Sequence, residues 1–308
     1  MMFEKLCMIV SQLATCITAG WMFHSILPES SRKRWLTFAG MILYLMLPAH
    51  VAIVGPNRDF TQSMLWMLVP FLAVMLGRMK RAARWTARLG YGALAVAALG
   101  VIGRNDGMAC LILLFLCGIA GICEKQWQYP VVGILGVLSA YPTYRTWKHW
   151  LFDGAFEESG LEYTSIMDRG YSLGGLFSTY FHRGGNPGMG ILLLGCLLFL
   201  LYNSFVKRRK LCAGKDWLWL GTATLLTVMS LRYFPWDYVE RLGIWALGLV
   251  SLLRTPAVFF GYAQMILCVW SVEKCDAVLQ MAEEDKRKKR NEGMEVCKVE
   301  ENSRDLAV

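Results

Sequence analysis

The sequence predicts an all-α fold, a polytopic bundle of about 9 transmembrane helices. Of its 308 residues, 56% are hydrophobic and only 18% are charged, whereas soluble domains carry about 25% charge. The apolar residues form repeated stretches of about 16 to 23 residues, close to the ~20 that span a ~30 Å hydrocarbon core. Basic residues collect in short clusters between these stretches. Because backbone groups in lipid find no water, each stretch is predicted to be helical.

The predicted spans follow one another along most of the chain. They cover residues 5–27, 35–54, 61–77, 89–103, 107–123, 129–146, 187–206, 216–231 and 257–272. The first is too long for an ordinary signal peptide and lacks a basic start and a small-residue cleavage site. We therefore expect one transmembrane domain at 1–273, with long outer loops at 147–186 and 232–256, and a charged, partly disordered cytoplasmic tail at 274–308.

The positions of the basic residues predict the orientation of the chain. Basic residues follow the first, third, fifth, seventh and ninth spans, and only the fifth is followed by a single one: Arg32, Lys33 and Arg34; Arg78, Lys80, Arg81, Arg84 and Arg88; Lys125; Lys207, Arg208, Arg209, Lys210 and Lys215; and Lys286, Arg287, Lys288, Lys289 and Arg290. Loops rich in Lys and Arg stay in the cytoplasm. The amino terminus is therefore predicted to lie outside and the carboxyl terminus in the cytoplasm, with the chain in a bacterial cytoplasmic membrane.

The net charge of +9 does not indicate a nucleic-acid partner, because a nucleic-acid-binding domain shows basic residues striped along one face with aromatics between them. Ten cysteines and four histidines show no metal-ligand spacing, so neither a metal nor another cofactor is expected. The run DKRKKR at 285–290 has a composition that binds anionic lipid, although such runs also occur simply as topology signals. Membrane lipid is thus an expected partner.

Two features of the outer segments predict interfacial structure. The spacing of Val239, Leu242, Trp245 and Leu249 suits an amphipathic helix lying in the interface. Four tryptophans fit an outer aromatic belt, namely Trp147, Trp150, Trp236 and Trp245. After residue 272, a short helix continuing from the last span is expected to give way to disorder.

Polar residues at the outer ends of the spans are the candidates for chemistry. A carboxylate there could act as a general base, and arginines could bind an anionic head group. The catalytic candidates are Asp59 and Asp106; the substrate-binding candidates are Arg58, Arg104, Asp237 and Arg254. The alternative is that these side chains are polar only because water surrounds the loops. No nucleophile elbow, phosphate-binding glycine loop or HExxH motif is present.

Four stretches together resemble a known family. They are ILYLMLPAHVAIVGPNRDFTQSMLWMLVPFLAVML (42–76), ILGVLSAYPTYRTW (134–147), PGMGILLLGCLLFLLY (187–202) and RYFPWDYVERLGIWALGLVSLLRTPAVFFGYAQ (232–264). They are similar to bacterial YfhO-like and 6-pyruvoyl-tetrahydropterin-synthase-related polytopic membrane proteins of GT-C glycosyltransferase type. The resemblance implies an enzyme that binds a polyprenyl-phosphate sugar at the outer face, with Asp59 or Asp106 as base and Arg58, Arg104 or Arg254 on the phosphate.

The chain departs from that family at two places. Where a second Phe-Pro-Trp-Arg-like motif is usual, the sequence reads Thr255-Pro256-Ala257-Val258. The family's first helix and its acidic catalytic loop are also missing, which indicates a fragment, a mis-started reading or a version without its catalytic part. Two other functions therefore stay open. One is a non-catalytic membrane subunit or scaffold with a membrane protein partner. The other is a transporter or flippase, disfavoured because no ionisable residue lies at the centre of a span.

Overall fold

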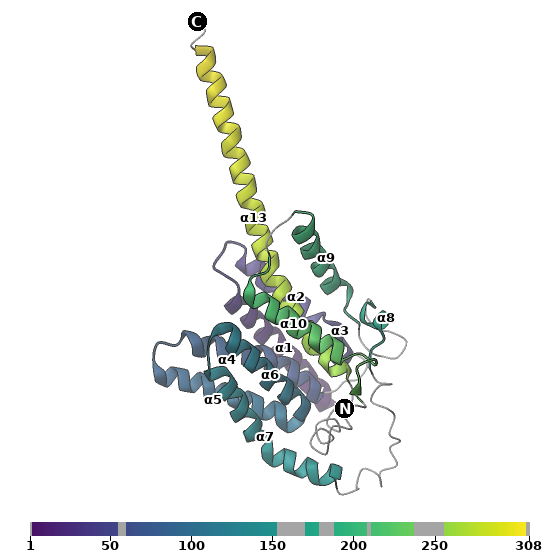
Figure 1. The fold of residues 1–308 in the computed structure, drawn as a ribbon. Helices are drawn as coiled ribbons and strands as arrows, with labels where there is room; N and C mark the ends of the chain where they lie inside the picture. Colours follow the sequence, from purple (N-terminus) through teal and green to yellow (C-terminus); the bar gives the residue numbers. More distant parts are fainter. Residues whose placement is uncertain are drawn as a thin grey trace.

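A computed structural model describes residues 2–54, 60–152, 170–178, 188–207, 211–236 and 256–305 (Figure 1). Over these residues the fold is all-helical and contains no β-strand beyond one isolated bridge between Tyr171 and Leu231. The helices, in chain order, are α1 (Met2–Ile26), α2 (Lys33–Leu45), α3 (Pro48–Val54), α4 (Phe60–Arg81), α5 (Trp85–Asn105), α6 (Gly107–Glu124), α7 (Gln128–Phe152), α8 (Leu173–Leu176), α9 (Ile191–Phe205), α10 (Gly214–Met229) and α13 (Ala257–Asp305).

Each predicted span coincides with a helix in the described ranges, and one of them is broken. Span 35–54 is divided into α2 and α3, with Leu47 and Pro48 at the break. A proline has no amide hydrogen and disfavours helical geometry in the residue before it, which explains a break at this point. Pro70 and Pro142 instead lie inside α4 and α7. In a bundle, neighbouring helices can satisfy the backbone groups that a proline leaves without a partner.

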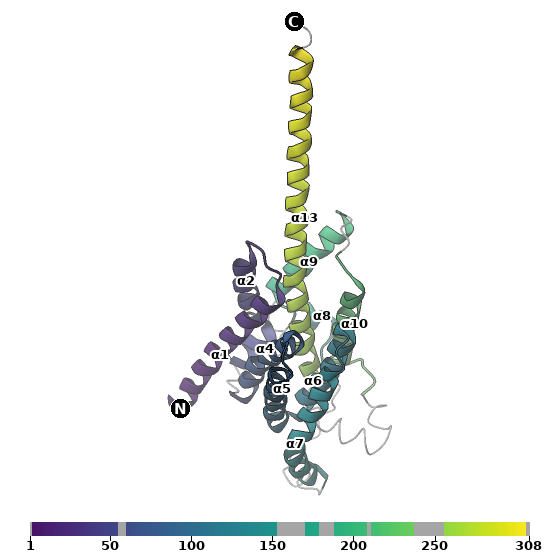
Figure 2. The same cartoon turned by 90° about the vertical axis from the view of Figure 1, so that its left-hand side faces the viewer.

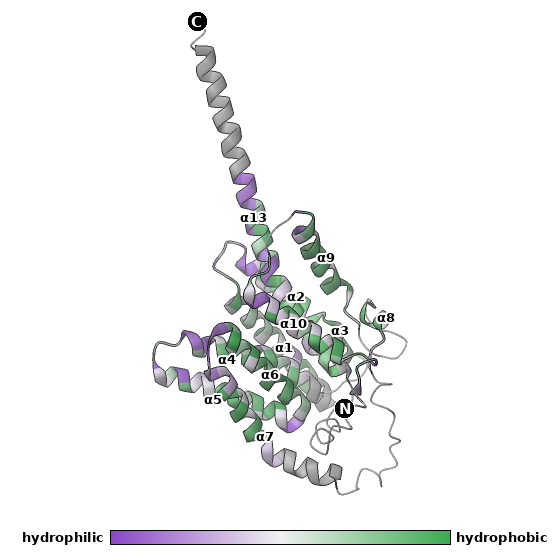
Figure 3. Cartoon of the chain, in the orientation of Figure 1, coloured by the Kyte–Doolittle hydropathy of each residue, from purple (hydrophilic) through white to green (hydrophobic). Residues whose placement is uncertain are grey.

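Four helices are long and apolar enough to cross a membrane within the described ranges: Leu6–Ile26, Ser63–Arg81, Trp85–Asn105 and Gly107–Glu124. Ile191–Phe205 is a shorter apolar helix. Figure 3 shows apolar residues along most of the bundle and polar residues at the helix ends and on α13. The described part of the chain is therefore a helical bundle with several helices apolar enough to cross a membrane.

The outward-facing surface of α1 is apolar. Leu6, Ile9, Leu13 and Ile17 are each more than half exposed and recur at helical spacing. Contiguous exposed apolar surface is uncommon on soluble monomers. Such a face is accommodated where lipid tails surround it.

Helices α5 and α7 approach each other closely through small residues. A Cβ atom added to Gly136 would lie 2.5 Å from Leu99 Cβ, and one added to Gly100 would lie 2.4 Å from Ser139 Oγ. Without a hydrophobic driving force in lipid, helix pairs associate through such close packing. The glycines of α5 and α7 therefore fit a membrane bundle. The main core, which includes Phe23, Tyr44 and Phe260, joins α1, α2 and α13.

Helix α13 has 49 residues and begins inside the bundle. Figures 1 and 2 show it projecting far beyond the other helices. It is longer than the short extension expected from composition. Its later residues are rich in Glu, Lys and Arg, which have high helix propensity and form pairs at i,i+4. The part from Glu273 onward is called the arm below.

Trp236 does not belong to an outer aromatic belt, contrary to the prediction. Its side chain is buried, stacks on Phe259 with ring centroids 5.7 Å apart, and donates from Nε1 to the carbonyl oxygen of Met229 at 3.2 Å. The hydrogen bond satisfies the indole inside the core. The structure describes neither the side chains of Trp147 and Trp150 nor Trp245.

Candidate functional site

The sequence-predicted site residues lie mostly in segments that the structure does not describe. Arg58 and Asp59 fall in 55–59, and Asp237 and Arg254 fall in 237–255. The convergence of these four residues on one site therefore stays a prediction. Two candidates are described, both at the junction between α5 and α6.

Arg104 and Asp106 lie on the two sides of this junction. Arg104 is exposed in the last turn of α5. Asp106 is the N-cap of α6, and its Oδ1 accepts a hydrogen bond from the Ala109 amide at 2.9 Å. The bond satisfies one of the amides that a helix start leaves without a partner. Asp106 thus has a structural role beside its predicted catalytic one.

A buried glutamine connects separate segments near the α2–α3 break. Gln264 of α13 is fully buried; its Nε2 donates to the Gly188 carbonyl at 2.7 Å, and its Oε1 accepts from the Ala49 amide at 3.4 Å. Buried amides are normally satisfied in this way. Gln264 therefore ties α3 and the segment before α9 to α13.

His50 is buried in the first turn of α3, with its ring centroid 5.3 Å from that of Trp66. Its Nδ1 lies 2.8 Å from the carbonyl oxygen of Leu45. Since a carbonyl only accepts, Nδ1 carries the hydrogen, and in the neutral ring Nε2 is an acceptor. Nε2 has no hydrogen-bond partner among the residues described. His50 therefore satisfies a carbonyl that the helix break leaves open, a role that Pro48 two residues earlier could have signalled.

The other end of the bundle is held by charged groups. Lys274 Nζ lies 2.9 Å from Asp216 Oδ2, and both side chains are buried. Asp216 also accepts from the Ala213 amide at 2.6 Å. This ion pair joins the first turn of α10 to the start of the arm.

Further contacts join the connections that were predicted to be cytoplasmic. Arg81, at the end of α4, donates to the Ser25 carbonyl at 2.6 Å, near the end of α1. Lys80 forms an ion pair with Glu124 at the end of α6. In the described structure, the basic connections after α1, α4 and α6 therefore lie near one another.

Four exposed tryptophans surround this same end, and the sequence reasoning missed them. Trp35, Trp85, Trp127 and Trp217 lie at or near the first turns of α2, α5, α7 and α10, and each is at least 66% exposed. Their signal was present in the sequence, because each follows a Lys or Arg by one or two residues, as in RKRW and GKDW. Tryptophans are enriched where a membrane meets water.

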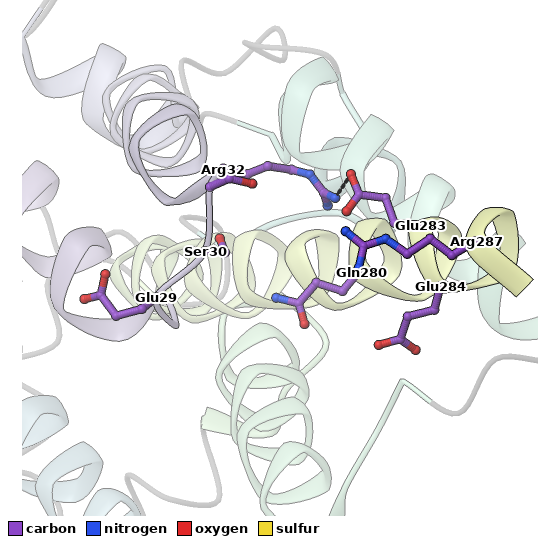
Figure 4. Close-up of a pocket in the computed structure, with 8 residues that line it drawn as sticks. Glu29, Ser30, Arg32, Gln280, Glu283, Glu284 and Arg287 are labelled. Carbon is purple, nitrogen blue, oxygen red and sulfur yellow. Dashed lines mark ion pairs between the residues drawn. The ribbon is translucent and has the colours of Figure 1, made fainter.

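A hollow of about 320 Å³ lies between the connection after α1 and the arm (Figure 4). Its lining consists of Glu29, Ser30, Ser31, Arg32, Gln280, Glu283, Glu284 and Arg287. Figure 4 shows Arg32 reaching across to Glu283, with which it forms an ion pair. The hydrogen bond from Lys33 to Glu29, at 2.5 Å, lowers the pKa of Glu29.

Asp276 lies one helical turn before Gln280, which donates to its Oδ2 at 2.9 Å. Burial raises the pKa of Asp276, while the positive charge of Arg32 and the Gln280 hydrogen bond act in the opposite direction. Its Oδ1 is buried with no partner among the described residues. This side of the arm thus carries incompletely satisfied polar atoms.

In chemical terms the two ends differ. Among the described residues, the predicted outer end offers the exposed guanidinium groups of Arg104 and Arg232, a capping carboxylate and an imidazole acceptor, whereas the other end offers a hollow of mixed charge. No group of three or more metal-ligating side chains occurs within the described part of the chain. Comparisons with protein-family models, with curated proteins and with solved structures find no match.

Proposed function

We propose that this chain is a multi-pass protein of a bacterial cytoplasmic membrane, with nine spans, the amino terminus outside and the carboxyl terminus in the cytoplasm. The observation that supports this is the gathering of Trp35, Trp85, Trp127 and Trp217 with the basic connections at one end of the bundle. Aromatic residues at the interface and positive charge beyond it are both characteristic of a cytoplasmic membrane surface.

Reporter fusions test this orientation. A reporter that is active only in the cytoplasm should work when fused after Arg81 and after Arg209, and one active only outside should work after Arg104. Arg81 and Arg209 on opposite faces would contradict the proposed topology.

Within the membrane, the proposed role is that of a non-catalytic subunit that presents a helical arm to a protein partner in the cytoplasm. The supporting observation is α13, a single helix from Ala257 to Asp305 whose start is fixed to α10 by the buried Lys274–Asp216 pair. An arm with a fixed base holds a partner at a defined distance from the membrane.

Photo-crosslinking from the arm tests this role. A crosslinking amino acid at Glu284, which is exposed, should capture one reproducible protein that is lost when residues 285–305 are deleted. The same amino acid at Trp85, which is exposed near the proposed interface, is the matched control and should not capture it. Equal recovery from both positions would contradict the proposal, as would recovery from neither.

A second candidate function is transfer of a sugar from a polyprenyl-phosphate carrier at the outer face. The observation that favours it is the exposed Arg104 beside Asp106 at one helix junction, since a guanidinium suits a phosphate and a carboxylate suits an acceptor hydroxyl. Membranes containing the chain should bind labelled polyprenyl-phosphate sugar, and binding should fall in Arg58→Ala, Arg104→Ala and Arg254→Ala. Unchanged binding in these variants would remove the assignments.

A further inference from the structure

The hollow beside the arm contains buried hydrogen-bond donors with no partner. Ser30 Oγ and Arg32 Nη1 are both buried and make no hydrogen bond to any described residue. A buried polar atom without a partner is uncommon and costs about 1–3 kcal/mol, so an occupant that the protein alone does not supply is expected. An acceptor-rich group such as a phosphodiester satisfies both atoms, because a guanidinium and a hydroxyl each donate to its oxygens.

The same hollow also contains carboxylates, which disfavour a purely anionic occupant. Glu29 pairs with Lys33 and Glu283 pairs with Arg32, whereas Glu284 is exposed and forms no ion pair with a described residue. Like charges placed close together repel, and a simple phosphate or an anionic head group would meet this repulsion. A metal cation is disfavoured by the two arginines of the lining, Arg32 and Arg287. A group that carries both a phosphate and a cation matches the whole lining.

The residues of the lining also indicate which kind of ammonium group the hollow can bind. None of its eight residues is aromatic, whereas quaternary ammonium groups are bound by aromatic rings. Carboxylates instead accept hydrogen bonds from an ammonium that has N–H groups. An ethanolamine-type ammonium therefore fits Glu284 better than a choline-type one.

We propose that this hollow binds a phosphodiester with a primary ammonium, as in the head group of phosphatidylethanolamine, with Arg32 and Ser30 on the phosphate and Glu284 on the ammonium. The location supports a lipid as the source. Trp35, three residues from Arg32, is 76% exposed, and exposed tryptophans are enriched at the head-group level. The lipid source rests on the orientation proposed above, whereas the head-group chemistry does not.

Native mass spectrometry of the purified full chain in detergent tests the site. At equal concentrations and with identical acyl chains, phosphatidylethanolamine should bind about tenfold better than phosphatidylcholine, the difference expected for a charge-assisted hydrogen bond. Phosphatidylglycerol should also bind more weakly than phosphatidylethanolamine. Equal binding of the ethanolamine and choline lipids would overturn the proposal and leave ordered water as the partner of the buried donors.

Variants locate the binding within the hollow. Arg32→Gln should weaken phosphatidylethanolamine binding about tenfold, and Glu284→Gln should reduce the preference for ethanolamine over choline while leaving phosphatidylglycerol binding intact or stronger. Arg34→Gln is the matched control, because Arg34 is exposed in the same segment and does not line the hollow. An Arg32→Gln variant that elutes as a single folded species and binds like Arg34→Gln would overturn the assignment.

Soluble glycerophosphoethanolamine separates the two sources of the head group. If it displaces the lipid at millimolar concentration, the head group alone is recognised; if it does not, the site needs a membrane-anchored lipid. Both results support the proposed chemistry. Reporter fusions assess the orientation independently, so a failure of the topology is distinguishable from a failure of the site.

Discussion

The two ends of the helical bundle are stabilised by different kinds of interaction. The end near the arm depends on ion pairs such as Lys274–Asp216 and Lys80–Glu124. The other end depends on neutral contacts, in which Gln264 bonds to backbone groups and Trp236 stacks on Phe259. The comparison shows that fixed charges collect at the end assigned to the cytoplasm, while close packing and satisfied amides hold the end assigned to the outside.

The largest effect is expected at the buried ion pair. Asp216→Ala removes the closer carboxylate of the buried Lys274, leaving Glu273 at 3.6 Å, and also removes the acceptor of the Ala213 amide. Breaking a buried pair from one side costs about 3–5 kcal/mol, so the free energy of unfolding in detergent should fall by that amount.

A double variant distinguishes the pair from its surroundings. Asp216→Leu combined with Lys274→Met replaces both charges by apolar groups, which is often nearly neutral for buried pairs. It should be clearly more stable than Asp216→Ala. If the two variants are equally unstable, the packing at this site matters more than the charges.

The next effect should come from the neutral end. Gln264→Leu leaves the Gly188 carbonyl and the Ala49 amide without their partner, and an unsatisfied buried group costs about 1–3 kcal/mol. Gln12→Leu is the matched control, because Gln12 makes one hydrogen bond, to Ser63, and is only partly buried. A loss in Gln12→Leu equal to that in Gln264→Leu would contradict the role given to Gln264.

A smaller, pH-dependent effect should appear at Asp276. Burial raises the pKa of this carboxyl in the folded chain, so the folded state binds the proton more readily than the unfolded one. The stability from this group is complete below the ordinary carboxyl range and is lost as pH rises through the folded pKa. The melting temperature of Asp276→Asn should therefore rise relative to that of the unchanged chain as the pH is raised from 4 to 7. A constant difference across that range would show that the carboxyl does not titrate with folding.

The smallest effect is expected at the exposed pair Lys80–Glu124. Lys80→Gln should cost less than about 1 kcal/mol, as surface pairs do. The loss should vanish in 1 M salt, where charges are screened within about 3 Å. Unfolding of Lys80→Gln and of the unchanged chain at 50 mM and 1 M NaCl measures this. The loss from Gln264→Leu should remain in 1 M salt, which separates the two ends.

The sequence predicted where the helices lie better than it predicted their breaks and their lengths. Apolar stretches of sufficient length located the helices. The break before Pro48 could not be distinguished from the prolines that α4 and α7 tolerate at 70 and 142, because packing against neighbouring helices decides between the two outcomes. The length of α13 was missed because its tail has the mixed charge of a disordered segment. The same charges also support a helix at i,i+4 spacing.

The candidate site was predictable only in part. The capping role of Asp106 was visible in the sequence, since an aspartate directly before an apolar run favours a helix start. The hollow was not visible, because it joins residues near 30 to residues near 284, and only the packing of the arm against that connection brings them together. The tryptophans beside Lys and Arg were visible but were overlooked in favour of the outer loops.

Because α13 is long, a small change in its tilt produces a large displacement of its carboxyl-terminal end. From Val272 to Asp305 it rises about 50 Å at 1.5 Å per residue, so a tilt of about 10° at its base would move its tip by about 9 Å. Small rearrangements among the membrane helices would thus be magnified into displacements the size of a side chain or more, far from the lipid.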